Sequence, residues 1–141
     1  MKVKAFIDTN TFIYGFEFKH SNSAAVLELI NEEKISAYIT LVVIKEISGY
    51  FKRHYSRDTA NQFVKYLLES CTLVFEEDCQ KELMQLRGKI KDKDLSQIAA
   101  TKALGLKYLI SFDRDFKPFL EYRTPKQFLK ENGFKTKETE Y

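Results

Sequence analysis

The sequence predicts an α/β protein, a three-layer α/β/α sandwich built on a short, mainly parallel sheet. Apolar runs typical of buried strands alternate along the chain with segments of helical periodicity. Two of these runs, residues 3–7 and 108–112, each end directly before an aspartate, Asp8 and Asp113. Because parallel strands are joined by crossover connections that usually contain helices, this alternation indicates a parallel sheet.

The first half of the chain is expected to form two strands and two or three helices. The strand at residues 3–7 is followed by a polar trio that begins at Thr9 and is typical of a helix cap. Aromatic residues then occur at every second position of segment 12–18, but Phe12 and Phe16 also share a helical face, so periodicity leaves helix and strand both open. The remaining expectations are a helix from about 21 to 34, a strand at 35–39 and a helix from Thr40 to about 55.

The second half repeats the alternation and ends in a polar tail. The expected elements are helices at 57–69 and 78–89, a strand at 72–75, a helix opened by Asp94 and ended by Gly105, a strand at 108–112 and a short helix capped by Asp115. We expect one domain over residues 1–133. Residues 134–141 are polar and are expected to be a mobile C-terminal tail.

Composition narrows the class of protein. A chain of 141 residues with 44% hydrophobic residues can bury one substantial core, which argues against disorder. The apolar run before Asp8 is too short for a secretion signal or a membrane span, so we expect a cytoplasmic protein with no membrane contact. Cys71 and Cys79 have no second cysteine pair and no nearby histidine, which predicts reduced, packed thiols.

The charge gives a weak indication of the partner. Formal net charge is +3, and setting aside four acidic residues discussed below leaves 16 acidic against 23 basic residues, a net charge of +7. An excess of this sign favours a polyanionic partner such as a nucleic acid. Lysine and glutamate are nevertheless mixed along the chain, as on any solvated surface, so charge alone does not assign a function.

Four acidic residues carry the functional argument: Asp8, Glu46, Asp94 and Asp113. Asp8 and Asp113 each end a predicted strand, and the carboxyl ends of parallel strands meet at one edge of a sheet. Carboxylates that converge repel one another unless a cation lies between them, which predicts a divalent-metal site. Oxygen ligands without thiolate or imidazole favour Mg²⁺ or Mn²⁺.

Each acid also has an ordinary structural explanation. Asp8 can cap a helix, and Glu46 can be a surface residue at the edge of an apolar helical stripe. Asp94 with Gln97 three residues later fits a capping box, and Asp113 can belong to a turn. No acid taken singly therefore decides between structure and chemistry.

The four acids and their surroundings, taken in order, resemble the PIN-domain family of metal-dependent nucleases. The matching segments cover most of the chain: Phe-Ile-Asp-Thr-Asn-Thr-Phe-Ile-Tyr at 6–14, Val-Ile-Lys-Glu-Ile at 43–47, Asp-Leu-Ser-Gln-Ile-Ala-Ala at 94–100, Leu-Ile-Ser-Phe-Asp-Arg-Asp-Phe at 109–116 and Thr-Pro-Lys-Gln-Phe-Leu at 124–129. Each of the first four segments contains one of the four acids. The resemblance implies that these acids are the catalytic and metal-binding residues.

The resemblance also implies an activity and partners. A compact single-domain member is most similar to the VapC toxins of type II toxin-antitoxin systems, so we expect an RNA-cleaving endoribonuclease that a small antitoxin protein inhibits. Exposed aromatic residues are compatible with a homodimer. The alternatives are a PIN-type nuclease that processes ribosomal or transfer RNA, and a non-catalytic RNA-binding module.

Two choices of ligand stay open in the sequence. Asp92 competes with Asp94, which we prefer because the packing pattern at 98–100 is in phase with it, and Asp115 competes with Asp113, which lies nearer the strand end. Candidate supporting residues, which would hydrogen-bond carboxylates or water, are Thr9, Asn10 and Ser111. Basic residues that could steer RNA are Lys45, Lys52, Arg53, Lys89, Lys91, Lys93, Arg114 and Lys117.

Overall fold

The computed structural model describes residues 2–141 and contains a single five-stranded sheet in that range. The strand order is β3-β2-β1-β4-β5, and every neighbouring pair is parallel. The strands are β1 (Val3–Ile7), β2 (Ile35–Thr40), β3 (Cys71–Val74), β4 (Tyr108–Ile110) and β5 (Tyr122–Arg123). The predicted parallel sheet is confirmed.

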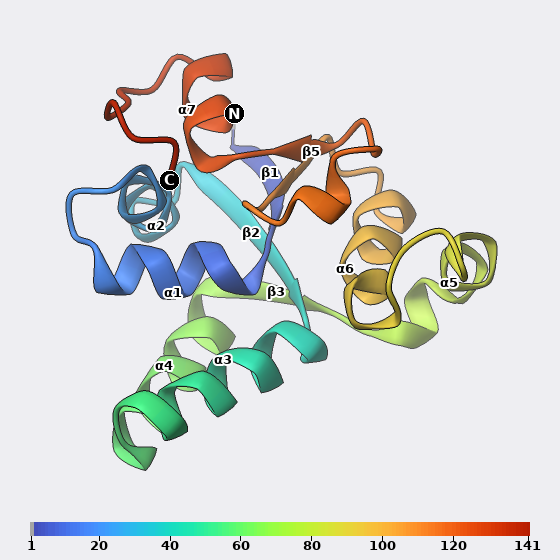
Figure 1. The fold of residues 1–141 in the computed structure, drawn as a ribbon, viewed down its shortest axis with the longest axis horizontal. Coiled ribbons are helices and arrows are strands. Elements are labelled where there is room, and N and C mark those ends of the chain that lie inside the picture. The colour runs from blue at the N-terminus through green and yellow to red at the C-terminus, as the bar shows by residue number, and fades with distance from the viewer. Residues whose placement is uncertain (1) are drawn as a thin grey trace.

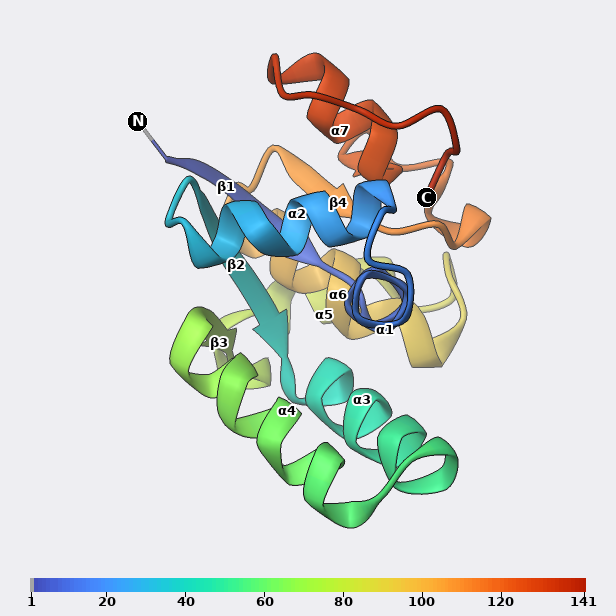
Figure 2. The ribbon, with the colours of Figure 1, turned by 90° about the vertical axis from the view of Figure 1, so that its left-hand side faces the viewer.

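Helices cover both faces of the sheet. They are α1 (Thr9–Glu17), α2 (Asn22–Asn31), α3 (Leu41–His54), α4 (Arg57–Ser70), α5 (Gln80–Leu86), α6 (Asp92–Ala103) and α7 (Pro125–Glu131). Helices α1 and α2 lie on one side of the sheet, and α5 and α6 lie on the other (Figure 1). The view from the side shows the same layers, with the α3 and α4 pair packed together at the β2–β3 end (Figure 2). This arrangement confirms the three-layer sandwich.

The core explains why the strands appear as continuous apolar runs. Ala5, Phe6 and Ile7 of β1 are all fully buried, because helices cover both faces of this central strand. Phe51 from α3 and Phe128 from α7 are also fully buried. Burying a side chain of this size stabilises the folded state by roughly 1.5–3 kcal/mol relative to exposure. The buried side chains of β1 thus fix the position of this strand and of the residue that follows it, Asp8.

The aromatic segment that periodicity left open is a helix. Helix α1 starts at Thr9, directly after the N-cap residue Asp8, whose side chain accepts a hydrogen bond from the Thr9 backbone N–H. Its buried face consists of Thr11, Phe12 and Gly15, a helical spacing. The other alternating aromatics, such as Phe16, are partly exposed.

Gly15 sets the close approach of α1 to α2, and it gives a first prediction. A Cβ added at Gly15 would lie 2.8 Å from Leu27 Cδ1 and 3.0 Å from the Ser23 backbone carbonyl carbon. We expect Gly15→Ala to lower the free energy of unfolding by about 1–3 kcal/mol, because two helices must move apart in a packed region. Urea unfolding followed by circular dichroism measures this change.

Gly49 provides the matched control. It lies inside α3, where an added Cβ would meet only the mobile Arg53 guanidinium, at 3.1 Å. Gly49→Ala should therefore raise the free energy of unfolding by up to about 1 kcal/mol through helix propensity. Equal effects at the two glycines would show that the α1–α2 contact is not tight.

Several element boundaries differ from the sequence expectations. The helix expected at 78–89 is a 3₁₀ turn at Glu76–Asp78 followed by the shorter α5, and the chain then turns through Gly88, which has a φ of 86°. Helix α6 begins at Asp92, so the expectation that Asp94 opens the helix is wrong, and Asp94 does not form the capping box that would have been its structural explanation. A 3₁₀ turn at Arg114–Phe116 replaces the short helix after β4, and Asp113 caps it in place of Asp115.

Two elements near the C-terminus had no counterpart among the expectations. Strand β5 has only two residues, too few for a periodic pattern. Helix α7 starts with a capping box in which the Thr124 side chain accepts from the Gln127 backbone N–H and the Gln127 side chain accepts from Thr124. This signal is present in the sequence and could have predicted the helix.

The polar tail contacts α2 in the structure. The Lys137 backbone N–H donates to Asn22 Oδ1 at 2.7 Å, and the Ser23 backbone N–H donates to the carbonyl oxygen of Tyr141 at 2.6 Å. The Tyr141 ring stacks on Phe112 with 4.3 Å between ring centroids. The mobility expected for residues 134–141 stays a prediction, and these contacts oppose it.

Two further expectations concerned membrane-spanning segments and the cysteines. Within residues 2–141, no helix combines the length and the apolar character that crossing a membrane requires. Cys71 and Cys79 are both free thiols, and Cys79 is buried.

Candidate metal centre

The candidate site lies where the strand order reverses. Chain order runs outward from β1 through β2 to β3, and then returns to β4 on the other side of β1. Asp8 follows β1 and Ser111 follows β4, and the Asp8 backbone N–H donates to the Ile110 carbonyl at 3.0 Å. Open parallel sheets bind ligands at such a switch point, outside the carboxyl ends of the strands.

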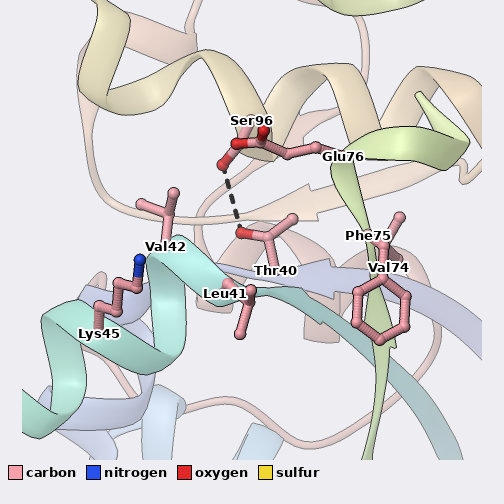
Figure 3. A pocket seen from close by; sticks show the side chains of 8 residues that line it. All are labelled: Thr40, Leu41, Val42, Lys45, Val74, Phe75, Glu76 and Ser96. Carbon is pink, nitrogen blue, oxygen red and sulfur yellow. Dashed lines mark hydrogen bonds between the residues drawn. The ribbon is translucent and has the colours of Figure 1, made fainter. Parts of the chain in front are cut away.

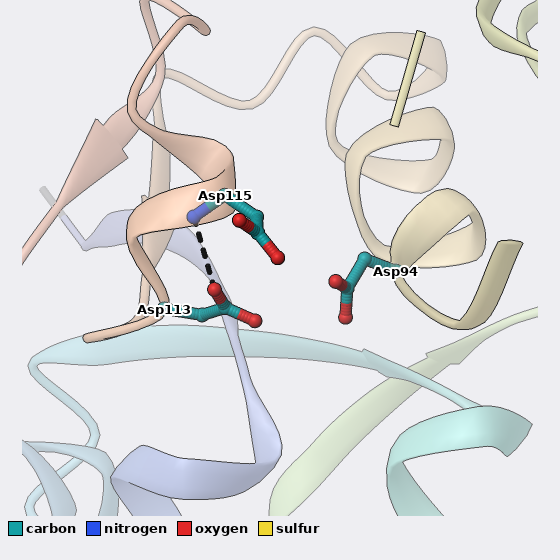
Figure 4. Close-up of side chains that lie close together, drawn as sticks. All are labelled: Asp94, Asp113 and Asp115. Carbon is teal, nitrogen blue, oxygen red and sulfur yellow. Dashed lines mark hydrogen bonds between the residues drawn. The ribbon is translucent and has the colours of Figure 1, made fainter. Parts of the chain in front are cut away.

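Three carboxylates converge at this edge. Asp94, Asp113 and Asp115 each place one oxygen atom within 4.8 Å of the others. Asp94 comes from the first turn of α6, whereas Asp113 and Asp115 come from the 3₁₀ turn after β4, and the two sets point toward each other across a gap (Figure 4). The structure thus brings Asp115 into the group together with Asp113.

Asp94 is the strongest indication that this gap takes a cation. Its side chain is buried, and within residues 2–141 its Oδ2 is the one buried side-chain oxygen or nitrogen that lacks a hydrogen-bond partner. Burial raises the pKa of Asp94, and the neighbouring charge of Asp113 raises it further. An unpartnered buried carboxylate oxygen is costly unless something binds it, and a divalent cation would do so.

Asp8 occupies a similar environment on the β1 side. The residue is 5% exposed, and its Oδ2 accepts a hydrogen bond from Ser111 Oγ at 2.8 Å. Burial raises the pKa of Asp8 to about 6, while its hydrogen bonds from Ser111 and Thr9 lower the pKa and the charges of Glu46 and Asp94 raise it. All four predicted acids therefore lie at the same edge of the sheet.

Hydrogen bonds from the predicted supporting residues join these acids. The Thr9 hydroxyl donates to Glu46 Oε1 at 2.6 Å. The Ser111 hydroxyl, which donates to Asp8, also accepts from the Asp113 backbone N–H at 2.9 Å and from Asn10 Nδ2 at 3.1 Å. The carboxylates of Asp8 and Glu46 are thus held in one orientation before any ligand binds.

Asp92 and Asp94 differ in burial and in the direction that their side chains face. Asp92 is the first residue of α6 and is exposed, whereas Asp94 is buried and faces the other carboxylates. Lys91 Nζ forms an ion pair with Asp115 Oδ2 at 3.1 Å, and the charge of Lys93 lowers the pKa of Asp94. A positive charge therefore already lies at the edge of the acidic group.

The other basic residues proposed to steer RNA are spread more widely. Lys45, next to Glu46 in α3, lines one pocket, and Arg114 and Lys117, which follow Asp113 in the chain, line another. Lys52 and Arg53 lie in the last turn of α3, and Lys52 lines a hollow between α3 and α4. Lys52 lies six positions after Glu46 in the helix, or roughly 9 Å along the axis, so Lys52 lies away from the acidic group.

Sequence reasoning missed residues that border the acidic group. Thr40, Phe75 and Ser96 line the same pocket as Lys45. Thr40 ends β2 and Phe75 directly follows β3, so the rule that identified Asp8 and Asp113 applies to them as well. They were overlooked because neither residue is ionisable.

The buried carboxyl of Asp8 gives a prediction for the metal-free protein. Its folded-state pKa of about 6 exceeds its ordinary value of 3.8, so folding favours the protonated form. The resulting stability is fully present below pH 4 and is lost as pH rises through 6, by up to about 3 kcal/mol. We expect Asp8→Asn, which cannot ionise, to flatten much of this fall in EDTA. Urea unfolding from pH 4 to pH 7 measures it, and identical pH profiles for the two proteins would contradict it.

Carboxylates gathered at the switch point of a parallel sheet define a class of α/β protein with a candidate metal site, and comparisons specify the family. The PIN-domain sequence profile matches residues 5–119. The chain belongs to the PIN-domain family. No curated protein matches the sequence significantly.

Several solved structures with the same fold are those of toxin-antitoxin proteins. VapBC2 of Rickettsia felis, bound to a DNA fragment from its promoter, has a TM-score of 0.69 at 17% identity, over 86% of this chain and 98% of that one. DNA-bound VapBC of Salmonella typhimurium has a TM-score of 0.70 at 14% identity, over 87% and 98%. VapC20 of Mycobacterium tuberculosis, a toxin that cleaves the sarcin-ricin loop, has a TM-score of 0.60 at 16% identity, over 81% and 93%.

Proposed function

We propose that this protein is a divalent-metal-dependent endoribonuclease and the toxin of a type II toxin-antitoxin pair. The observation that carries the proposal is the buried, unpartnered Asp94 Oδ2 among carboxylates at the sheet's switch point. Membership of the PIN-domain family and the likeness to VapC toxins support the same activity. With RNA as substrate, the protein would act in the cytoplasm.

The donor set fits a hard cation. Asp94, Asp113 and Asp115 would hold it, with Asp8 and Glu46 completing the acidic edge. Every donor is a carboxylate oxygen, which suits Mg²⁺ or Mn²⁺ better than zinc. Bound there, such an ion neutralises phosphate charge and lowers the pKa of a coordinated water.

The chain's own residues supply orientation and charge. Ser111 and Thr9 fix the Asp8 and Glu46 carboxylates through the hydrogen bonds described above. Lys91, paired with Asp115, lies where its ammonium group can attract a phosphate of the RNA backbone. Lys91 would hold the scissile phosphate beside the acids and leave it open to attack by water.

Histidine-based acid–base cleavage lacks a site within the described part of the chain. His20 is exposed in the connection between α1 and α2. His54 is exposed at the end of α3, where its ring packs on Tyr50 with 4.4 Å between centroids. Neither residue has a place among the carboxylates, so hydrolysis is assigned to the acidic edge.

The antitoxin is part of the proposal. The structural neighbours include toxin-antitoxin complexes. Phe16 and Phe18 of this chain are 41% and 51% exposed at the end of α1, which offers apolar surface to a protein partner or to a second copy of the chain. A PIN-type nuclease for ribosomal or transfer RNA would share the acidic edge but would need no antitoxin.

RNA cleavage in vitro tests the activity. We expect purified protein to cut RNA with Mg²⁺ or Mn²⁺, to stop in excess EDTA and to recover when Mn²⁺ is restored. The physical reason is that the acidic edge repels the phosphate backbone unless a cation neutralises it. Cleavage at full rate in EDTA would contradict the metal dependence, and its absence with every RNA and metal tried would contradict the nuclease assignment.

A further inference from the structure

A pocket of about 260 Å³ opens beside the acidic edge, at the carboxyl ends of β2 and β3. Its walls come from the end of β2, the first turns of α3 and α6, and the segment after β3 (Figure 3). Its lining residues include Thr40, Leu41, Lys45, Phe75, Glu76 and Ser96. None of them is needed to hold the carboxylates described above.

The pocket has both apolar side chains and buried hydroxyl groups in its lining. Leu41 and Phe75 are large apolar side chains that are 47% and 46% exposed. Thr40 and Ser96 are buried, and their hydroxyl oxygens lie 3.3 Å apart. Figure 3 shows these two hydroxyl groups pointing toward each other. A ligand that fits has apolar faces and a hydrogen-bonding edge, which describes a nucleobase better than an aliphatic side chain.

An RNA strand that crosses the acidic edge would also pass the pocket. Strand β2 neighbours β1 in the sheet, and β3 follows β2, so the pocket lies roughly 5–10 Å along the edge from Asp8. Helix α3 supplies Glu46 to the acids and Lys45 to the pocket. Helix α6 likewise supplies Asp94 to the acids and Ser96 to the pocket.

We propose that this pocket binds one nucleobase of single-stranded RNA next to the scissile phosphate. The base would stack on Phe75 and Leu41 and meet the hydroxyls of Thr40 and Ser96 with its polar edge, while Lys45 engages the adjoining backbone phosphate. The proposal rests on the nuclease function proposed above and specifies its substrate as an unpaired strand. Sequence preference at one flanking position follows from the shape and the hydroxyls of the pocket.

Equilibrium binding in EDTA tests the pocket without hydrolysis: the acidic edge then weakens binding of two probes with the same backbone alike, and the ratio of their affinities reports on the bases. The probes are a fluorescently labelled single-stranded RNA heptamer and a heptamer with the same backbone in which abasic residues replace every nucleotide. We expect the wild-type protein to prefer the base-containing probe by about 10-fold, the scale of one base stacked on an aromatic ring. Phe75→Ala should lose most of this preference, and Phe75→Tyr should keep it.

A second variant tests the contact with the RNA backbone, and a third serves as a control. Lys45→Ala should weaken both heptamers alike and reduce the salt dependence of binding by about one phosphate contact. Leu68→Ala is the matched control, because Leu68 is 55% exposed on α4 outside the pocket, and it should change nothing. Thermal melts check that each variant is folded.

Equal affinity of the wild type for the two probes overturns the base pocket, as does an unchanged preference in folded Phe75→Ala. A changed molecular mass of Phe75→Ala in light scattering, with the preference intact, would assign the surface to contact between copies of the chain instead. Base preference without any RNA cleavage would keep this inference and reject the catalytic proposal. Cleavage without base preference would do the reverse.

Discussion

Asp94→Asn is expected to lower kcat for RNA cleavage by roughly 10²-fold or more, the scale of removing a key electrostatic element from an active site. The substitution keeps the shape of the side chain but removes the charge of the buried carboxylate that has an unpartnered oxygen. Initial rates on one RNA at saturating Mn²⁺ measure the effect. Circular dichroism melts verify that the variant folds.

Asp92→Asn is the matched control for this prediction. Asp92 lies in the same turn of α6 but is exposed, so the variant should keep wild-type turnover within experimental error. The comparison also decides the choice that the sequence left open. Loss of activity in Asp92→Asn with normal turnover in Asp94→Asn would show that Asp92 is the functional acid.

Expression in a host that lacks the partner gene is expected to arrest growth, and Asp8→Asn is expected to abolish the arrest. Asp8 is buried between Ser111 and the other acids, so its charge contributes to the metal centre even though its side chain has little contact with solvent. Growth curves and colony counts after induction measure the effect. Immunoblots must show equal amounts of the two proteins.

Equal arrest by both proteins would indicate that the protein acts by binding RNA or a protein rather than by cleaving RNA. No arrest by the wild type, combined with cleavage in vitro, would favour a processing nuclease over a toxin. Co-expression of a small protein encoded beside this gene should restore growth if that protein is the antitoxin. The result thus separates the three functional hypotheses that the sequence allowed.

Much of the site was predictable because it depends on strand ends. Asp8 directly follows β1 as expected, and the parallel pairing of β1 with β4 brings it beside Ser111. Such placement follows from sheet topology, which an alternating pattern of strands and helices specifies well. The hydrogen bonds from Thr9 and Asn10 follow from their position immediately after Asp8.

The details that sequence could not supply depend on local turns. Asp115 joins Asp94 and Asp113 because a 3₁₀ turn follows β4, and its geometry has no distinct sequence pattern. The start of α6 at Asp92 was missed because its N-cap residue, Lys91, makes no side-chain capping hydrogen bond, whereas Asp94 with Gln97 has the pattern of a capping box. Several contacts of the tail use backbone atoms, such as the Tyr141 carbonyl, which any residue could provide.

Binding of Mn²⁺ measured by titration calorimetry tests the central claim, that carboxylates at the β1–β4 edge form a divalent-cation site. The account predicts saturable binding to the wild type, with release of protons near pH 6 because the pKa of Asp8 is raised to about 6. Asp94→Asn should bind at least about 10-fold more weakly, and Asp92→Asn should bind like the wild type. Absence of binding to the wild type at millimolar Mn²⁺, or identical binding to Asp94→Asn, would contradict the metal centre.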